Sequence, residues 1–462
     1  MIRLFKHYIP HAVILLGLAD FVLLVISGEL GWLFRARQIG IANGSMLDRW
    51  EPLAVFAVLV QLAMIAVGAY GPDALRSMRH AAARLLVAVS LGIIALSVVY
   101  FLVPGHTLWR SNLAYAMFIA LGLLFANRLI LGGLLGASAF RRRVLVLGAG
   151  HRAARLRALG GRPESGFVIV GYVRMSEGSP LVQEAIPRAA IHDLTRHVAN
   201  LAATEVVLAL EERRNALPLK DLLRIKTAGV HVNDFSTFIE RETGRVDLDT
   251  LNPSWLIFSD GFSSGRMVSS AGKRLFDLVA SMVLLVIALP VIAVFALLVK
   301  LDSEGPAFFR QTRVGLYGED FGLIKLRSMR TDAESDGRAV FAAQDDPRVT
   351  RIGRIIRKLR IDELPQAWSV LKGEMSFVGP RPERPQFVAS LEEGLPYYAE
   401  RHMVKPGITG WAQINYPYGA SMEDSRHKLE YDLYYAKNYT PFLDLLILLQ
   451  TLRVVLWHEG AR

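Results

Sequence analysis

The 462-residue chain contains no cysteine. Disulfide bridges, thiolate metal sites and a cysteine nucleophile are therefore excluded, although this absence does not identify a cellular compartment. Charged residues are also scarce, at 21% of the chain, whereas 52% of its residues are hydrophobic and the mean hydropathy is +0.31. A chain this apolar differs from ordinary soluble proteins, and its length suits two or three domains. We predict a membrane protein.

Acidic residues are outnumbered by basic ones, 42 to 53, which gives a net charge of +11. Nucleic-acid binding would require basic and aromatic residues interleaved on a soluble module, and the sequence shows no such module. The positive excess therefore favours anionic lipid headgroups or phosphorylated substrates as partners, and no nucleic acid.

Long apolar runs are abundant in the first third of the chain, at roughly residues 10–34, 52–71, 83–103 and 112–136. Each run is close to the roughly 20 residues that a helix needs to cross about 30 Å of hydrocarbon. We predict four transmembrane helices within residues 1–140. The first run is too long for a removable signal peptide and lacks the cleavage pattern, so we expect it to remain as an anchor.

Lysine and arginine flank this membrane region at both ends. Arg3 and Lys6 precede the first run, and residues 141–143 are all arginine. Because positive residues prefer the cytoplasmic side, both ends of the four-helix region are expected there. The connecting loops are equally basic and do not decide the orientation.

Residues 141–262 alternate short β-rich runs with helical stretches, which predicts a Rossmann-like, doubly wound α/β domain. The first turn, from Gly148 to Ala153, matches G-x-G-x-x-A and could seat a diphosphate on a helix N-terminus. The acidic residue that would grip a ribose is missing, because the second strand is followed by Arg174 and Met175. We therefore favour a structural or nucleotide-sensing domain over nicotinamide binding.

A further apolar segment, residues 275–301, carries Pro290 at its middle. Proline removes a backbone hydrogen bond and bends or breaks a helix. Lys273 and Lys300 flank the segment, so both of its ends prefer the same side of the membrane. We predict a re-entrant helix that breaks at Pro290; the alternative is a fifth, proline-kinked span.

An adjacent carboxylate pair, Asp362 and Glu363, lies among three arginines. These are Arg357, Arg360 and Arg381. Neighbouring carboxylates repel each other unless cations or a metal keep both ionised. Mg²⁺ usually binds through one or two carboxylates together with substrate phosphates, so the pair suits a nucleotide-diphosphate site. The alternative is a surface turn with ordinary solvated charges.

Seven ordered motifs surround this pair. They are KRLFD (273–277), GPAFFRQTRVG (305–315), KLRSM (325–329), DPRVTRIGR (346–354), RIDELPQ (360–366), LKGEMSFVGPRP (371–382) and KPGITGWAQIN (405–415). Together they resemble the monotopic phosphoglycosyl transferases, or bacterial sugar transferases. The four apolar runs and the α/β domain in front resemble the long form of that family. The stretch INYPYGAS (414–421) and the ending WHEGAR look like its exopolysaccharide-associated PEP-CTERM subgroup.

The resemblance implies an α+β monotopic catalytic domain over residues 263–462. It implies transfer of a sugar 1-phosphate from a UDP-sugar to polyprenol (undecaprenyl) phosphate, which gives polyprenyl-diphospho-sugar and UMP and starts exopolysaccharide synthesis. Asp362 would be the nucleophile, forming an aspartyl-phosphosugar, and Glu363 would hold Mg²⁺ with Asp362 or assist proton transfer. A homodimer in the bacterial inner membrane, with the catalytic domain facing the cytoplasm, is expected on the same ground.

Four cations are expected to bind the phosphates. Arg381 comes first, because prolines on both sides fix the backbone of its turn and a guanidinium binds phosphate in bidentate fashion. Lys325 and Arg327 occupy alternate positions of a predicted strand and would share one face. Arg357 precedes Asp362 by five residues, where the family often has arginine; Arg327 could instead pair with an acid at a domain seam.

Lys273 and Asp277 lie four residues apart before Pro290, on one helical face. They could pair with each other, or the lysine could meet a lipid phosphate.

Two other functions are considered. Some membrane-bound nucleotide-sugar epimerases and dehydratases also place spans before a dinucleotide domain, but they need a tyrosine with a lysine four residues later. None of the 14 tyrosines has that lysine. A non-catalytic scaffold of polysaccharide assembly is the third possibility, which the intact acidic pair and Arg381 disfavour. The sequence does not identify the sugar or the polymer.

Overall fold

A computed structural model describes the chain in segments, within which the following statements apply. The segments are residues 2–4, 7–9, 11–41, 44–70, 78–102, 110–134, 141–162, 165–175, 180–211, 217–251, 267–333, 346–417, 419 and 421–457. The chain divides into two compact units, Met1–Leu4 with Tyr8–Thr250 and Phe5–His7 with Leu251–Arg462. The predicted domain boundaries after residues 140 and 262 lie outside the described residues.

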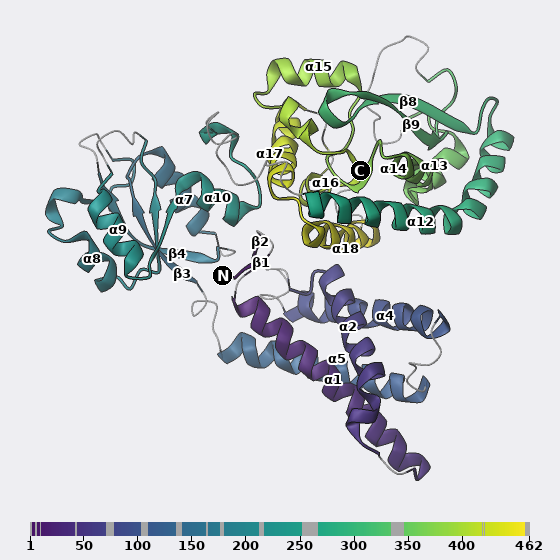
Figure 1. The fold of residues 1–462 in the computed structure, drawn as a ribbon, viewed down its shortest axis with the longest axis horizontal. Coiled ribbons are helices and arrows are strands. Elements are labelled where there is room, and N and C mark those ends of the chain that lie inside the picture. The colour runs from purple at the N-terminus through teal and green to yellow at the C-terminus, as the bar shows by residue number, and fades with distance from the viewer. Residues whose placement is uncertain are drawn as a thin grey trace. The chain divides into compact units, whose positions relative to one another are not determined.

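The predicted apolar runs of the first unit form helices (Figure 1). These are α1 (His11–Ile39), α2 (Trp50–Ala66), α4 (Met78–Leu102) and α5 (Arg110–Leu134), with a 3₁₀ turn η1 (Met46–Arg49). All four helical regions, η1 and α2 being continuous, are long and apolar enough to cross a membrane, as is one helix of the second unit. That they cross remains a prediction.

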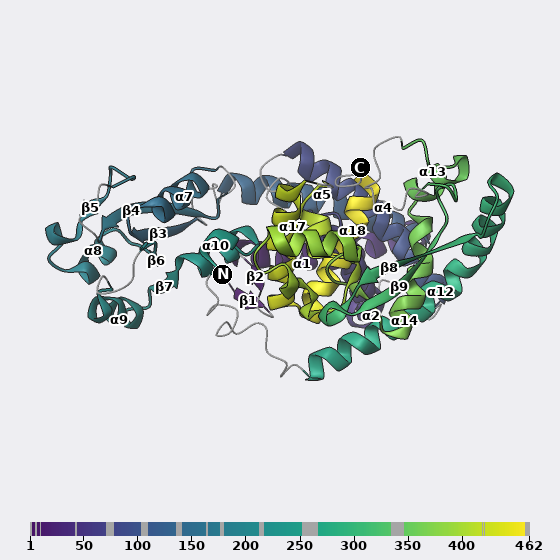
Figure 2. The ribbon, with the colours of Figure 1, turned by 90° about the horizontal axis from the view of Figure 1, so that it is seen from above.

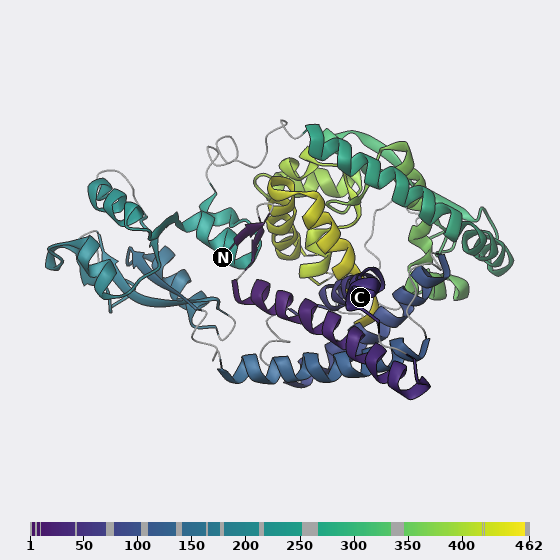
Figure 3. The same cartoon turned by 60° about the horizontal axis from the view of Figure 1, so that its bottom comes forward.

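Helices α1 and α5 pack closely along each other (Figure 3). A Cβ atom at Gly31 would lie 2.8 Å from the backbone nitrogen of Ala116, so glycine permits this contact. The two helices also share a buried ion pair, in which Arg128 Nη2 lies 2.7 Å from Asp20 Oδ2. Removing water from both charges is costly unless the pair is well bonded, and Asn127 donates a further hydrogen bond to Asp20.

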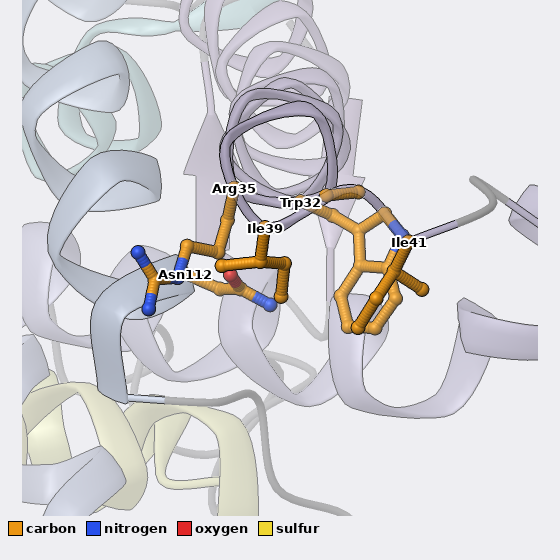
Figure 4. Close-up of a pocket in the computed structure, with 6 residues that line it drawn as sticks. Trp32, Arg35, Ile39, Ile41 and Asn112 are labelled. Atoms are coloured by element: carbon orange, nitrogen blue, oxygen red, sulfur yellow. The ribbon is translucent and has the colours of Figure 1, made fainter.

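A small recess lies where the end of α1 meets the start of α5 (Figure 4). Its lining is Trp32, Arg35, Ala36, Ile39, Ile41 and Asn112. Asn112 is 1% exposed, and neither its amide nitrogen nor its oxygen has a hydrogen-bond partner among the described residues. A buried polar group without a partner lowers the stability of the fold.

The α/β domain has a parallel five-stranded sheet in the order β5-β4-β3-β6-β7. Its strands are β3 (Arg142–Leu147), β4 (Phe167–Arg174), β5 (Ile186–Pro187), β6 (Glu205–Leu208) and β7 (His231–Asp234). Its helices are α7 (His151–Gly160), α8 (Leu194–Asn200), α9 (Leu219–Thr227) and α10 (Phe235–Thr243), with 3₁₀ turns η3 (Arg188–Ala190) and η4 (Leu248–Thr250). One core joins the sheet to α7 and α10, and another joins it to α8 and α9. The predicted doubly wound parallel sheet is confirmed.

The second unit combines helices with two small sheets. Strands β8 (Phe308–Val314) and β9 (Asp320–Leu326) form an antiparallel hairpin, and β10 (Ser376–Val378) pairs in parallel with β11 (Gly407–Thr409). The helices are α12 (Met267–Asp302), α13 (Arg351–Lys358), α14 (Ala367–Lys372), α15 (Pro385–Gly394), α16 (Trp411–Asn415), α17 (Met422–Asn438) and α18 (Pro441–Trp457). The 3₁₀ turns are η5 (Leu316–Gly318), η6 (Ile361–Gln366) and η7 (Ala399–Met403).

Helix α12 continues through Pro290, so the break predicted at that residue is not present. One proline removes a single hydrogen bond, and the neighbouring turns maintain the helix. The ribbon of α12 nevertheless changes direction along its length (Figure 2). One face, including Ala288 and Ile292, packs on the unit's core, whereas Val286 and Ile287 are exposed. The re-entrant path itself remains a prediction.

Candidate active site

The carboxylate pair lies on η6, directly after α13. Arg360 separates the two elements and has φ 54°, a left-handed conformation. A non-glycine residue in this conformation costs roughly 1–2 kcal/mol. Its amide donates to the carbonyl of Arg357, and its own carbonyl accepts from the amide of Glu363. The turn thus holds Asp362 and Glu363 in a fixed position after α13.

Three cations surround the Glu363 carboxylate. Arg381 Nη2 lies 3.1 Å from Oε1, Lys325 Nζ lies 3.8 Å from Oε1, and Arg360 Nη1 lies 3.5 Å from Oε2. Burial raises the pKa of Glu363, but Arg381, Lys325 and Arg360 outweigh this effect and lower the pKa to about 2. Glu363 is therefore an anion throughout the physiological pH range.

Lys325 is the buried cation of the group. Burial lowers its pKa to about 8, although the negative charges of Glu363 and Asp362 act in the opposite direction. The ammonium group is therefore mostly charged at neutral pH and loses its proton just above it.

Asp362 differs from its neighbour. Burial and the adjacent Glu363 charge raise its pKa, whereas Lys325, Arg357 and Arg381 lower it in part. Among the described residues its carboxylate has no hydrogen bond and no ion pair within 4 Å. A carboxylate that lies near cations without a direct partner can bind a metal or attack an electrophile such as phosphorus.

The turn that carries Arg381 is held by backbone contacts between β10 and β11. Gly379 donates to Thr409, and Gly407 donates to Pro380, each over 2.9 Å. A Cβ atom at Gly379 would lie 2.2 Å from the carbonyl oxygen of Lys405, so only glycine permits this approach. The predicted rigidity of the turn therefore has a physical basis.

Arg401 and Asp432 hold the backbone at Arg381 through contacts that the sequence did not predict. Arg401 Nη2 donates to the carbonyl oxygen of Arg381 over 3.0 Å and to Asp432 Oδ2 over 2.7 Å. Both side chains are almost fully buried. Because the two residues are 31 positions apart and belong to no recognisable local pattern, only the fold reveals the pair.

Arg327 is not brought to the carboxylates, and its predicted role in phosphate binding stays a prediction. Its guanidinium donates to the carbonyl of Ser303 over 2.7 Å and to the carbonyl of Glu304, at the end of α12. The last carbonyls of a helix lack intrahelical partners and attract a cation. Strand β9 ends at Leu326, so the alternation that placed Arg327 on the face of Lys325 no longer applies.

Lys273 and Asp277 do not pair with each other. Lys273 Nζ lies 2.6 Å from Asp444 Oδ2, and Asp277 Oδ1 accepts from the amide of Phe377 over 3.1 Å. These bonds attach α12 to α18 and to β10, which leads into the turn of Arg381. The predicted pairing of Lys273 with Asp277 is therefore wrong, whereas contact of Lys273 with a lipid phosphate stays a prediction.

Comparison with known proteins gives two matching family models. The one described as bacterial sugar transferase matches residues 268–458, and the one described as CoA-binding domain matches residues 65–226. The first match contains the carboxylate pair and all the cations around it.

Three relatives illustrate the similarity. An Aeromonas hydrophila protein named UDP-N-acetylgalactosamine-undecaprenyl-phosphate N-acetylgalactosaminephosphotransferase is 43% identical over 241 residues, which cover 52% of this chain and 56% of the relative. A Komagataeibacter xylinus undecaprenyl-phosphate glucose phosphotransferase is 45% identical over 194 residues, 41% of this chain and 36% of the relative. A Xanthomonas campestris pv. campestris UDP-glucose:undecaprenyl-phosphate glucose-1-phosphate transferase is 31% identical over 331 residues, 69% of this chain and 68% of the relative.

The match thus spans about half or less of the first two relatives, but two thirds of the third. Together with the family model over the second unit, this similarity means that the chain belongs to the bacterial sugar transferase family.

Proposed function

We propose that this protein transfers a sugar 1-phosphate from a UDP-sugar to polyprenyl phosphate through a covalent intermediate on Asp362. The main support for this proposal is the unequal environment of the two carboxylates. Three cations bind Glu363, and two of them, Lys325 and Arg381, also act on Asp362, whose carboxylate has no direct partner among the described residues. A pair whose surroundings push the two pKa values apart indicates two different roles.

In the first step, an Asp362 oxygen attacks the sugar-bearing phosphorus and the bond to the bridging oxygen breaks. UMP leaves with the electrons of that bond. In the second step, an oxygen of polyprenyl phosphate attacks the same phosphorus and the Asp362 carboxylate is regenerated. Arg381 and Lys325 stabilise the charge that develops on the phosphoryl oxygens, since both already converge on this position.

Asp362 and Glu363 are the residues that would hold Mg²⁺. The described residues contain no group of three or more histidine, aspartate or glutamate side chains around one point, so an all-protein metal cage is not formed there. Two carboxylates together with substrate phosphates are the usual Mg²⁺ arrangement, and the donor set therefore fits. When bound, the ion would neutralise charge on the departing UMP.

Both ends of α12 are attached to polar groups of the same unit, which supports a re-entrant path. Lys273 binds Asp444 near the start, and Asp302 Oδ2 accepts from the amide of Ile352 over 3.0 Å near the end. A helix that crossed the membrane would place one of these attachments beyond about 30 Å of hydrocarbon. The unit would therefore rest on the cytoplasmic face of the inner membrane, where polyprenyl phosphate and soluble UDP-sugar meet.

The sugar is left open, because the relatives named above act on N-acetylgalactosamine or glucose. Action at the first step of exopolysaccharide synthesis, membership of the PEP-CTERM subgroup and a homodimer remain parts of the proposal.

The test is UMP release from a panel of UDP-sugars by the full chain in detergent, with Mg²⁺ and polyprenyl phosphate. Asp362→Asn should abolish release, because an amide is a poor nucleophile. Asp332→Asn is the matched control, since Asp332 is exposed and, among the described residues, pairs with the nearby Arg330. Without polyprenyl phosphate, mass spectrometry should detect one phosphosugar on the peptide that contains Asp362.

Release that persists in Asp362→Asn would contradict the role of Asp362. Release with no phosphosugar on the protein would favour direct transfer between the two substrates.

A further inference from the structure

The α/β domain has the topological switch point that forms the nucleotide crevice in folds of this type, where the diphosphate binds. The order of its strands reverses between β3 and β6, and helix α7 begins there after the Gly148–Gly150 turn. Open parallel sheets bind ligands at such a point, with the diphosphate on the helix N-terminus. The matching family model, described as CoA-binding domain, implies such a ligand. CoA contains a diphosphate, so the crevice can be tested for its fit.

A side chain of the protein itself bonds to the backbone where the diphosphate would lie. Glu211, which follows β6, accepts a hydrogen bond at Oε1 from the Arg152 amide over 3.1 Å. Glu211 Oε2 also lies 3.9 Å from Arg152 Nε. The carboxylate thus supplies the negative charge that a helix N-terminus attracts.

The glycines of the turn bring parts of the chain together. A Cβ atom at Gly150 would lie 2.7 Å from Glu211 Oε1. Gly148 has φ +141°, and a Cβ atom there would lie 2.2 Å from the carbonyl oxygen of Ala209. In a nucleotide-binding turn, the second glycine allows the diphosphate to approach the backbone. Here it allows Glu211 to approach.

The segment after β4 covers the same turn. The carbonyl of Ala149 accepts hydrogen bonds from the amides of Leu181 and Val182, over 2.9 and 3.2 Å. Val182 is fully buried in the core next to α7. The region that would receive a ribose therefore holds protein, and the described residues that end and follow β4, Arg174 and Met175, are not acidic.

We infer that Glu211 is a built-in occupant of the anion position and that the α/β domain binds neither CoA nor a dinucleotide in this crevice. The residues do not fit the ligand that the family description implies. A diphosphate would meet the Glu211 carboxylate, and two anions at one helix end repel each other. The glycines of the G-x-G-x-x-A pattern thus allow Ala209 and Glu211 to pack against the turn.

The test uses the full chain in detergent, titrated calorimetrically with CoA up to millimolar concentration. The wild type should show no saturable binding in the crevice, whereas Glu211→Ala should bind CoA with a dissociation constant at least tenfold below the highest concentration titrated. Glu184→Gln is the matched control. Glu184 is exposed and pairs with Arg157, which lies on α7 as Arg152 does. CoA that binds at the catalytic unit would be lost in Arg381→Gln.

A second measurement does not depend on any ligand. Hydrogen–deuterium exchange of the peptide containing Arg152 should be about tenfold faster in Glu211→Ala than in the wild type, and unchanged in Glu184→Gln. Equal exchange in all three proteins would overturn the role of Glu211. Wild-type CoA binding that survives Arg381→Gln and is lost in Gly150→Val would overturn the inference about the crevice.

Discussion

Replacing Arg401 should separate the stability of the second unit from the positioning of Arg381. The Arg401 guanidinium is buried, and it donates hydrogen bonds to Asp432, to the hydroxyl of Tyr398 and to the carbonyl of Arg381. Arg401→Met removes all of these bonds and leaves Asp432, which is 2% exposed, without its cation. Removing one member of a buried ion pair costs about 3–5 kcal/mol. We expect a loss of that size in the free energy of unfolding.

Combining Arg401→Met with Asp432→Leu should restore most of this stability. Replacing both members of a buried pair by apolar residues is often neutral or stabilising. The Arg381 carbonyl would still lack its donor, however, and a hydrogen bond from a charged group contributes about 1.5–3 kcal/mol. If that bond orients Arg381 in the transition state, kcat/KM should remain roughly 10- to 150-fold below the wild-type value.

The assay combines thermal unfolding in detergent with the UMP-release kinetics of the same preparations. Arg384→Met is the comparison variant, because it removes another arginine close to Arg381 in the chain. A double variant that recovers both stability and activity would refute the positioning role. A double variant as unstable as Arg401→Met would refute the assignment of the loss to unpaired Asp432.

Further predictions concern pH, packing and metal dependence. Lys325 has a pKa of about 8, so phosphate binding through its charged form should weaken as the pH rises through 8; in Lys325→Arg this fall in UMP release should move to higher pH. Asn112→Leu should raise the unfolding temperature of the helical region, because it removes an unpaired buried amide worth about 1–3 kcal/mol; an unchanged temperature would show that the amide is satisfied in the membrane. Arg327→Met should destabilise the end of α12 but leave the KM for UDP-sugar unchanged, and a raised KM would restore its phosphate-binding role. Removal of Mg²⁺ by EDTA should abolish UMP release, and full activity without the ion would exclude the proposed metal.

The sequence predicted elements whose signal is local. Apolar runs of membrane length became α1, α2, α4 and α5, and β-rich runs became parallel strands. Asp362, Glu363, Lys325 and Arg381 could be grouped because they belong to ordered motifs, and the structure brings them together.

Predictions failed where partners are distant in the chain. Arg327 lies just beyond the end of β9, where the alternation of strand side chains stops. Lys273 and Asp277 have the spacing of a helical pair, yet each bonds to a residue about 100 or more positions away. Glu211 occupies the anion position from the other side of the crevice, so the glycine pattern alone could not identify its ligand.

The charge around the carboxylate pair explains how an aspartate can attack a phosphate. Four cations act on the pair: Lys325, Arg357, Arg360 and Arg381. Two carboxylates balance only two of these charges, and the surplus matches a UDP-sugar, which carries one negative charge on each phosphate. Before Mg²⁺ is counted, the two substrate phosphates would therefore balance the charge of these six side chains. Repulsion between Asp362 and the phosphoryl oxygens is offset by cations whose positions are fixed before the substrate arrives, since Arg381 and Lys325 already contact Glu363. Glu363→Gln should consequently impair the reaction although Glu363 does not attack: without its charge, Arg381 and Lys325 lose the group that holds them beside Asp362.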